Sequence, residues 1–323
     1  MATPFDTKLV TVFGGSGFVG KQVVRALAQR GWRVRVAVRK ATYAYDLKPL
    51  GGVGQIQVTR CDVRKEADIA AALNGASAVV NLVGILYETP SQSFDELHRS
   101  ASKAIAEAAA ARGISDFVQI SALGADAKSG SKYAASKGQA EAAVHKAIAS
   151  AIIVRPSVVF GPQDGFFTSL AQQVKLFPLM PSIGGGKTKF QPVYVGDVAR
   201  AVGEVLGNAA YAGQTFELGG PEVFTYNELV TYVGQEVQSP RPLVWMPVFA
   251  ARLIALVGDV SSFLIKPLLT NDQVTLLQSD NIVTGKTLGF KDLAIAPTAV
   301  ESVVPSYLWR FRKNGQFAEV VNG

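Results

Sequence analysis

The sequence predicts an α/β fold, a doubly wound parallel sheet followed by a smaller, mostly helical C-terminal lobe. Three observations predict it. Apolar runs rich in Val, Ile and Leu alternate with helix-length segments through residues 1–160, which is typical of parallel strands buried on both faces. A glycine-rich turn joins the first run to the first helix. After Gly161 the alternation fades into loops rich in proline and glycine.

The strands expected in the first half of the chain cover residues 9–13, 34–38, 55–58, 78–84, 116–121 and 151–160. The helices expected between them cover residues 19–30, 66–73, 94–113 and 131–149. Because this alternation builds a Rossmann-type sheet, we expect a dinucleotide-binding domain over residues 1–160. Residues 161–323 then form the C-terminal lobe, which contributes late sheet elements and helices, among them a helical stretch at 242–278.

Composition excludes several classes of protein. The chain has 323 residues, of which 48% are hydrophobic and 18% charged, and a chain this apolar is not disordered. Cys61 is the only cysteine, so an intrachain disulfide scaffold is excluded. His98 and His145 have no Cys or His partner at metal-ligand spacing, so no metal site is expected.

The positive charge is concentrated in the first half of the chain. Residues 1–160 carry 20 Lys and Arg against 12 Asp and Glu, whereas residues 161–323 carry 12 against 13. The basic stripe with stacking aromatic residues that is typical of nucleic-acid binders is missing from the sequence, so no nucleic-acid partner is expected. An anionic small molecule bound by the first half explains the asymmetry better.

The ends and the apolar runs predict a soluble or peripheral protein. Residues 1–13 show neither a secretory signal nor an Arg- and Ser-rich presequence. The most apolar run, residues 243–257, is interrupted by Pro247 and Arg252, and it is shorter than the roughly 20 apolar residues that cross a bilayer. It is either a buried helix or a helix that lies against a membrane or a partner.

The turn after the first strand has the spacing of a phosphate-binding loop. Gly14, Gly17 and Gly20 follow a G-x-x-G-x-x-G pattern. A side chain at the first glycine would block the tight turn, at the second it would keep the backbone from a pyrophosphate, and at the third it would separate helix and strand. The start of the helix supplies N–H groups for the anion. The remaining contacts expected in this loop are Ser16, Phe18 and Val19.

Basic residues stand where the choice between NAD and NADP is made. Arg39 and Lys40 follow the second strand, where NAD-preferring sites place an Asp or Glu for the ribose 2′-hydroxyl. A guanidinium binds a 2′-phosphate instead, so NADPH is the expected cofactor. The alternative is that Arg39 is only a solvent-exposed charge at the end of a strand. Asp62 and Val63, after the third strand, are expected near the adenine.

Acid–base residues follow the later strands. Ser121 ends the fifth strand, and Tyr133 and Lys137 lie four apart in the next helix, on one helix face. An ammonium lowers the pKa of a neighbouring phenol, and a serine hydroxyl orients a substrate oxygen. The alternative is that Ser121, Tyr133 and Lys137 are positioned as an acid–base triad but catalyse no reaction. The backbone contacts expected at the nicotinamide end are Leu82, Val83, Gly84 and Pro156.

These motifs resemble the short-chain dehydrogenase/reductase superfamily in its extended and atypical branches, the NAD-dependent epimerase/dehydratase-like proteins. The resemblance rests on FGGSGFVG (13–20), NLVG (81–84), YAASK (133–137) and VRPSVVFG (154–161). Phe13 replaces the usual Thr before the first glycine. The segments 152–170 and 189–202 further resemble the NADPH-binding accessory (39-kDa-type) subunits of respiratory complex I, and this likeness extends over nearly the whole chain.

The resemblance implies an NADPH that is held tightly and stabilises the subunit, with Ser121, Tyr133 and Lys137 retained without independent turnover. It further implies partners among the complex I subunits near the quinone site and peripheral contact with the membrane. Without a presequence, a bacterial version at the cytoplasmic face of the inner membrane is expected.

Two other functions stay open on the residues alone. The first is an independent NADPH-dependent reductase, epimerase or dehydratase that uses Ser121, Tyr133 and Lys137. The second is a redox-sensing regulator that binds NADP(H) without chemistry and couples that binding to a partner.

Overall fold

The computed structural model describes residues 8–261 and 270–317 of the chain. Its contacts divide these residues into two compact units. The first unit contains the described residues up to Pro156 together with Gly196–Leu218 and Thr284–Ile295. The second contains Ser157–Val195, Gly219–Val283 and the residues from Ala296 onward. The chain therefore enters the first unit three times.

The first unit is built on a seven-stranded sheet whose paired strands all run parallel. Its order is β11-β6-β5-β4-β1-β2-β3. The strands are β1 (Leu9–Phe13), β2 (Arg33–Val38), β3 (Ile56–Arg60), β4 (Ala78–Asn81), β5 (Asp116–Ile120), β6 (Ile152–Pro156) and β11 (Thr215–Leu218). The chain order reverses between β1 and β4, and such a switch point opens a crevice at the carboxyl ends of the strands.

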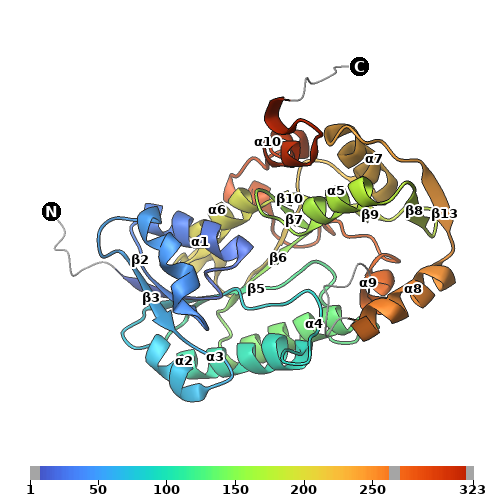
Figure 1. Ribbon diagram of the computed structural model, residues 1–323. Coiled ribbons are helices and arrows are strands. Elements are labelled where there is room, and N and C mark those ends of the chain that lie inside the picture. Colours follow the sequence, from blue (N-terminus) through green and yellow to red (C-terminus); the bar gives the residue numbers. More distant parts are fainter. Residues whose placement is uncertain (1–7, 262–269, 318–323) are drawn as a thin grey trace. The chain divides into compact units, whose positions relative to one another are not determined.

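Helices cover both faces of this sheet (Figure 1). On one face lie α2 (Glu66–Ala72), α3 (Ala101–Ala110) and α4 (Lys132–Ala147), and on the other lie α1 (Phe18–Gln29) and α6 (Val195–Val205). Short helices complete the unit, namely η1 (Ala41–Leu50), η2 (Asp95–Ser100), η3 (Ala209–Tyr211) and η4 (Phe290–Leu293). The expected doubly wound sheet of the Rossmann type is confirmed.

Burial on both faces explains why the strands are continuous apolar runs. All four residues of β4 are buried, and Val79 and Phe117 pack with Ile105 and Val144 from the helices of one face. A strand covered on both sides has no solvent-facing positions, so β4 lacks an alternating pattern, whereas the outer strand β3 leaves Gln57 and Arg60 exposed. Without an alternating pattern, the ends of such strands are hard to predict from the sequence. The expected strand 78–84 ends at Asn81.

Two expected elements differ from the prediction. Residues 95–100, expected as the first turns of an α-helix over 94–113, form a π-helical segment that continues into α3. The expected strand 151–160 is interrupted after Pro156 and resumes as β7 (Val159–Phe160), which belongs to the second unit. Both departures occur beside expected site residues.

The second unit has short strands in three pairs. β7 pairs with β10 (Val193–Tyr194), β8 (Met180–Ile183) with β13 (Leu243–Met246), and β9 (Lys189–Phe190) with β12 (Phe224–Thr225). Its helices are α5 (Phe166–Leu176), α7 (Tyr226–Glu236), α8 (Val248–Ser261), α9 (Asn271–Leu276) and α10 (Pro305–Leu308), with the short η5 (Val300–Ser302), η6 (Trp309–Phe311) and η7 (Gly315–Phe317). The expectation of a helical stretch from residue 242 is wrong for 243–246, because these residues complete a parallel strand pair. The part of that stretch at 262–269 lies outside the described residues.

The core of the second unit joins α5, α7 and the C-terminal helix. Phe160, Phe167, Val233 and Leu308 are fully buried in it. Tyr307 also donates a short hydrogen bond to Asp164, a buried carboxylate that accepts further bonds from backbone N–H groups. Burial raises the pKa of Asp164.

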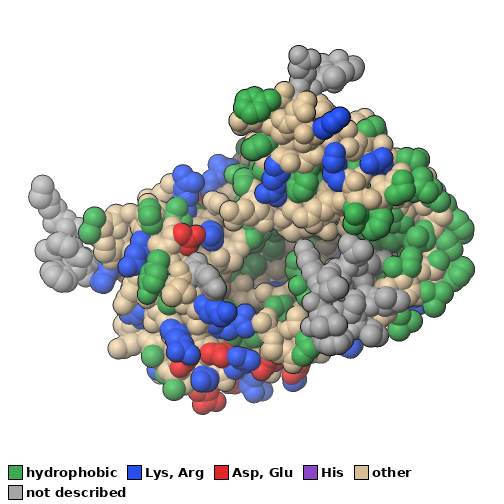
Figure 2. All heavy atoms as spheres, viewed as in Figure 1, with side chains coloured by type: hydrophobic (Ala, Val, Ile, Leu, Met, Phe, Trp, Pro, Cys, Tyr) green, Lys and Arg blue, Asp and Glu red, His purple; other side chains and the backbone are tan. Residues whose placement is uncertain are grey.

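Apolar side chains also gather on the surface over β13 and α8 (Figure 2). Trp245, Phe249 and Leu253 are 67%, 69% and 61% exposed, whereas Ala251 and Ala255 on the other side of α8 are buried against α9. Among the described helices, none combines the length and hydropathy that a bilayer crossing requires.

Candidate functional site

The turn between β1 and α1 is shaped by its glycines. Gly14 has a φ of +77°, and a side-chain carbon there would lie 3.0 Å from the carbonyl carbon of Leu82. At Gly20, such a carbon would lie 2.4 Å from the carbonyl oxygen of Gly14, which no rearrangement of a side chain relieves. Gly17 closes the turn by donating its N–H to that same oxygen at 3.1 Å. Gly15, which the glycine pattern does not include, is packed against Val36.

The first turn of α1 faces this loop with free donors. Gly17 occupies the N-cap position and has no side chain that could accept from the helix. Phe18 and Val19 follow, and both are half-buried, as is Ser16. Unsatisfied N–H groups and the positive end of the helix dipole attract an anion. The predicted phosphate loop therefore has the geometry of a diphosphate cradle.

At the end of β3, Asp62 is held by a neighbour. Its carboxylate accepts from Nε and Nη2 of Arg64 at 2.8 and 2.7 Å. These hydrogen bonds lower the pKa of Asp62 to about 2. The adjoining Cys61 and Val63 are buried, and burial raises the pKa of the Cys61 thiol to about 12. The cysteine is therefore unreactive, and Arg64 is a site residue that the sequence interpretation missed, although it stands only two residues after Asp62.

At the end of β2, Arg39 contacts a residue from a distant loop. With the Gln92 amide oriented so that its oxygen faces the guanidinium, this oxygen accepts from Nη1 and Nη2 of Arg39 at 2.8 and 3.1 Å. Arg39 and Lys40 are both exposed. The basic pair thus stands at the carboxyl edge of the sheet, as predicted, and Gln92 is a second residue that the sequence pattern could not indicate.

The segment after β4 lies directly over the glycine turn. The Leu82 N–H donates to the Phe13 carbonyl at 2.9 Å, and the Val83 N–H donates to Asn81 Oδ1 at 3.1 Å. Asn81 is buried and its amide group also donates to Ser102 and Gln119. This asparagine therefore fixes the course of the loop.

Lys137 is the most deeply buried cation of the site. The residue is 6% exposed, and its Nζ lies 5.9 Å from the centre of the Tyr133 ring and donates to the Ile120 carbonyl at 3.4 Å. Burial lowers the pKa of Lys137 to about 8, while the charge of Glu141 opposes that shift. A side-chain carbon on Gly84 would lie 3.2 Å from this ammonium, so the segment after β4 passes close to Lys137.

Ser121 carries an unused hydrogen-bonding group. The residue is 4% exposed, and its hydroxyl oxygen has no partner among the described residues. Its backbone N–H donates to the Val154 carbonyl at 2.7 Å, and Leu123 donates to the carbonyl of the buried Pro156 at 3.0 Å. A buried hydroxyl without a partner is costly, so Ser121 Oγ can accept or donate a further hydrogen bond.

His98 links the segment after β4 to α4. Its Nε2 accepts from the Ile85 N–H at 3.0 Å, so its proton is on Nδ1, which lies 2.8 Å from Ser136 Oγ. That hydroxyl donates to the Tyr133 carbonyl at 2.7 Å. Burial and the nearby Lys137 lower the pKa of His98 to about 3, so the ring is neutral. Phe94 stacks on it, and Tyr133 meets both rings edge-on.

This role of His98 could not be predicted from a motif, because it depends on contacts with Ile85 and Ser136, which are distant in the chain. No group of three His, Cys, Asp or Glu suited to a metal occurs among the described residues.

The structure brings several predicted site residues to the carboxyl edge of one sheet, namely the glycine turn, Arg39, Asp62, Ser121, Tyr133 and Lys137. A phenol beside an ammonium and an unsatisfied hydroxyl can exchange a proton with a bound oxygen.

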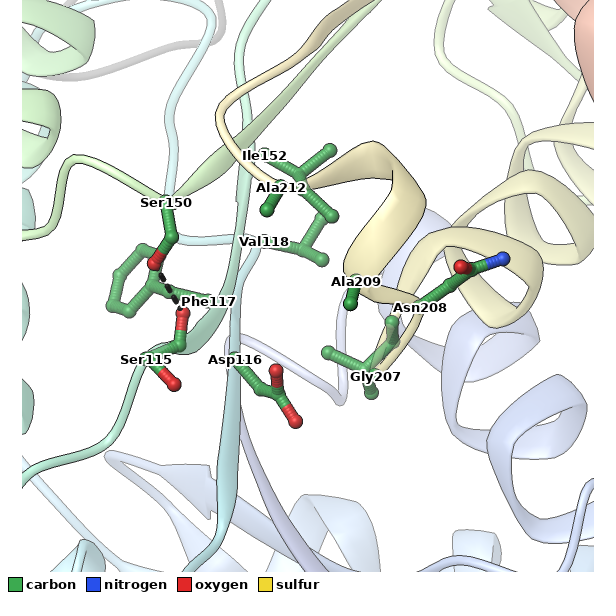
Figure 3. A pocket seen from close by; sticks show the side chains of 11 residues that line it. Ser115, Asp116, Phe117, Val118, Ser150, Ile152, Gly207, Asn208, Ala209 and Ala212 are labelled. Carbon is green, nitrogen blue, oxygen red and sulfur yellow. Dashed lines mark hydrogen bonds between the residues drawn. The ribbon is translucent and has the colours of Figure 1, made fainter.

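A separate pocket lies at the opposite edge of the same sheet (Figure 3). It is lined at the start of β5 by Asp116 and Phe117 and at the start of β6 by Ile152, with Gly207 and Asn208 across from them. Ser150 Oγ donates to the Ser115 carbonyl at 3.0 Å. None of the predicted site residues lines this pocket.

Comparison with known proteins gives consistent matches. A model of the "NAD dependent epimerase/dehydratase family" matches residues 10–219. The chain is 36% identical over 316 residues to the "NADH dehydrogenase (ubiquinone) 1 alpha subcomplex subunit 9, mitochondrial" of Arabidopsis thaliana, and the match covers 95% of this chain and 79% of that protein. It is 32% identical over 298 residues to the mouse (Mus musculus) protein of the same name, covering 91% of this chain and 78% of that protein.

Among solved structures, the chain is similar to an NADPH-dependent quinone oxidoreductase from Escherichia coli complexed with NADPH. The TM-score is 0.73 and the identity 20%, with 93% of this chain and 99% of that chain covered. At this identity the likeness concerns the fold.

Proposed function

The chain belongs to the NAD dependent epimerase/dehydratase family, and we propose that it is an NADPH-binding accessory subunit of respiratory complex I, the NADH:quinone oxidoreductase. In this proposal the nucleotide stabilises the subunit and is not turned over. The observation that carries the proposal is the identity of 36% and 32% to two subunits named for NADH dehydrogenase, over more than nine-tenths of this chain. The family resemblance predicted from the sequence motifs is confirmed by the same matches.

The residues at the carboxyl edge of the sheet fit a dinucleotide. The glycine turn is so tight that a side-chain carbon at Gly14 or Gly20 would collide with backbone atoms, and the N–H groups at the start of α1 would bind the diphosphate. Ser16, Phe18 and Val19 would line the same turn. Ser121 offers a buried hydroxyl without a partner, as expected where a ligand supplies one. A bound nicotinamide dinucleotide would supply a hydride donor or acceptor at this end of the site.

The basic residues after β2 favour the phosphorylated form of the cofactor. Arg39 and Lys40 would bind a 2′-phosphate through charge-assisted hydrogen bonds. The carboxylate of Asp62 is occupied by Arg64, so it would meet the adenine amino group through its remaining lone pairs, beside the buried Val63. At the other end of the cofactor, Leu82, Val83, Gly84 and Pro156 would line the nicotinamide, and Tyr133 and Lys137 would bind its ribose.

We further propose that the two parts of the chain divide the work. Residues 1–160 would bind the nucleotide. The exposed apolar side chains Trp245, Phe249 and Leu253 would face other subunits near the quinone site or the membrane surface, with the protein held peripherally at the cytoplasmic face of a bacterial inner membrane. A side of α8 that leaves large apolar groups in water is stabilised when a partner or a lipid surface covers it.

A second candidate function is an independent NADPH-dependent reductase, epimerase or dehydratase. The lowered pKa of Lys137 and the unpartnered hydroxyl of Ser121 favour it, since both are features of sites that move protons. In this case Tyr133 would exchange the proton of the substrate oxygen, Lys137 would tune the pKa of the phenol and Ser121 would orient that oxygen. Tyr133→Phe would then abolish turnover.

The experiment that separates the two functions is affinity purification of the tagged chain from detergent-solubilised membranes, with native mass spectrometry and extraction of the bound nucleotide from the same sample. We expect a large quinone-reductase assembly that contains about one NADPH per copy of the chain. A species of one or two chains that exchanges its cofactor freely would contradict the subunit proposal and support the enzyme. The variant Gly20→Ala serves as the nucleotide-free control.

A further inference from the structure

The segment that follows β4 starts on one side of the glycine turn and ends on the other. At its start, the Leu82 N–H donates to the Phe13 carbonyl, the last residue of β1. At its end, with the Gln92 amide oriented so that its oxygen faces the guanidinium, this oxygen accepts from both Nη atoms of Arg39, the first residue after β2. In the sheet, β1 lies between β4 and β2. Residues 82–92 therefore cross the carboxyl end of β1, where the glycine turn lies.

This crossing segment is fixed along its length by hydrogen bonds. His98 accepts from the Ile85 N–H at 3.0 Å, Glu88 accepts from the Phe94 N–H at 2.8 Å, and Thr89 and Gln92 exchange two backbone hydrogen bonds of 2.9 and 3.0 Å. The segment thus presents the Gln92 side chain to Arg39 from a defined backbone position.

The contact between Gln92 and Arg39 leaves the charge of the guanidinium available. An amide oxygen orients a guanidinium without cancelling its positive charge, whereas a carboxylate would cancel it. The carboxylate that acts electrostatically with Arg39 is Asp62, and Asp62 is paired with Arg64. Among the described residues no ion pair of Arg39 occurs. The arrangement is an oriented cation at the edge of a diphosphate cradle.

We infer that Gln92 is a specificity-determining residue of the nucleotide site, because it positions the Arg39 guanidinium for a 2′-phosphate. This inference rests on the proposed NADPH site and adds a residue to it. It assigns to Gln92 a positioning role that acts through Arg39. The effect of Gln92 must therefore depend on the 2′-phosphate and must disappear when Arg39 is absent.

The test is titration of the purified full chain, stripped of nucleotide, with NADPH and with NADH, followed by nucleotide fluorescence. We expect Gln92→Ala to weaken NADPH binding by roughly 10-fold, the effect of a hydrogen bond to a charged group, and to change NADH binding by less than about 2-fold. Gln92→Glu places a carboxylate against Arg39, and we expect it to weaken NADPH further and leave NADH bound. The rate of NADPH release should rise in both variants.

Two controls separate this role from a general loss of structure. Gln57→Ala removes the oxygen that accepts from Arg35 on the exposed side of β3, a matched Gln–Arg contact, and should leave both affinities unchanged. In the Arg39→Ala background, Gln92→Ala should have no further effect on NADPH. Equal losses for NADPH and NADH, or an undiminished loss without Arg39, would overturn the inference. If the unaltered chain binds neither nucleotide, the proposed function fails instead.

Discussion

At the end of β2 and β3 the polar residues of the site are exposed, whereas at the start of α4 they are buried. The side chains of Arg64 and Asp62 are 37% and 20% exposed, but Lys137 and His98 are only 6% and 1% exposed. In the exposed group, opposite charges pair with one another. Losing such a pair costs little free energy, since water solvates the separated charges. In the buried group, every unmade hydrogen bond and every charge costs free energy.

One sheet edge therefore combines two environments. At the exposed end the charges are solvated, so a change in their sign costs little stability. The buried end holds a lysine with a pKa of about 8 and a hydroxyl without a partner, so the unliganded fold is destabilised there. A bound ligand that satisfies these groups would stabilise the protein, as the proposed structural role of the nucleotide requires.

The largest effect on nucleotide binding is expected from Gly20→Ala. The added carbon would lie 2.4 Å from a backbone oxygen, so the turn must change shape and the diphosphate cradle is lost. We expect no measurable binding of NADPH or NADH by titration calorimetry. Gly130→Ala, where an added carbon meets nothing within 4 Å, is the control and should bind as the unaltered chain does. Retained binding in Gly20→Ala would show that the turn does not hold the nucleotide.

The second prediction concerns the buried end. Because burial lowers the pKa of Lys137 to about 8 from 10.5, Lys137→Met should raise the free energy of unfolding of the nucleotide-free protein at pH 7 by up to about 3 kcal/mol. Urea denaturation measures this change. Lys146→Met removes the same charge from an exposed position of α4 and should have little effect.

The sign of the pH dependence tests the same residue. Below pH 8 the ammonium is charged in both states, and the folded state carries the full cost of burying it. Between pH 8 and about 10.5 the folded state loses the proton first, so the free energy of unfolding rises with pH relative to Lys137→Met. If the difference between the two proteins does not depend on pH in this range, the lysine is not destabilising.

At the exposed end, Arg39→Asp should weaken NADPH binding by roughly 10- to 100-fold, since it removes a charge-assisted partner and adds repulsion. NADH binding should stay the same or improve. Arg33→Asp changes the charge equally at the opposite end of the same strand and should spare both nucleotides. An unchanged NADPH affinity in Arg39→Asp, measured by calorimetry, would remove Arg39 from the site.

The smallest effect is expected from Arg64→Ala. Without its hydrogen bonds, the pKa of Asp62 should rise from about 2 toward its ordinary value, as an NMR titration of the carboxyl carbon can show. A depressed carboxyl pKa stabilises the fold above its unfolded value near 4, and this contribution is lost as the pH falls toward 2. Because the pair is partly solvated, the change in stability at pH 7 should be small.

The sheet and the glycine turn could be predicted from the sequence because both depend on neighbouring residues. Continuous apolar runs identify buried parallel strands, and the spacing of Gly14, Gly17 and Gly20 reflects local turn geometry. The strand at 243–246 was missed because it lies within one long apolar run, in which short strands and helices look alike. Its partner Met180–Ile183 is distant in the chain.

The residues missed at the site act through tertiary contacts. His98 lies in the π-helical segment and bonds to Ile85 and to Ser136 of α4, and Gln92 reaches Arg39 by way of a loop without regular spacing. Neither residue stands at a fixed offset from a motif. Residue type and position led to the roles expected of Arg39, Tyr133 and Lys137, but they could not indicate the neighbours that set the charge and orientation of these side chains.

The edge strand β11 has a consequence for how this protein is made. Its residues Thr215–Leu218 pair with β6, and a fragment that stops at residue 160 would leave the backbone groups of β6 open to any passing strand. During translation, about 60 residues beyond residue 160 must be synthesised before β11 can pair with β6. Until then the edge of β6 is unpaired in the nascent chain. A purified fragment of residues 1–160 would keep this edge unpaired and would aggregate.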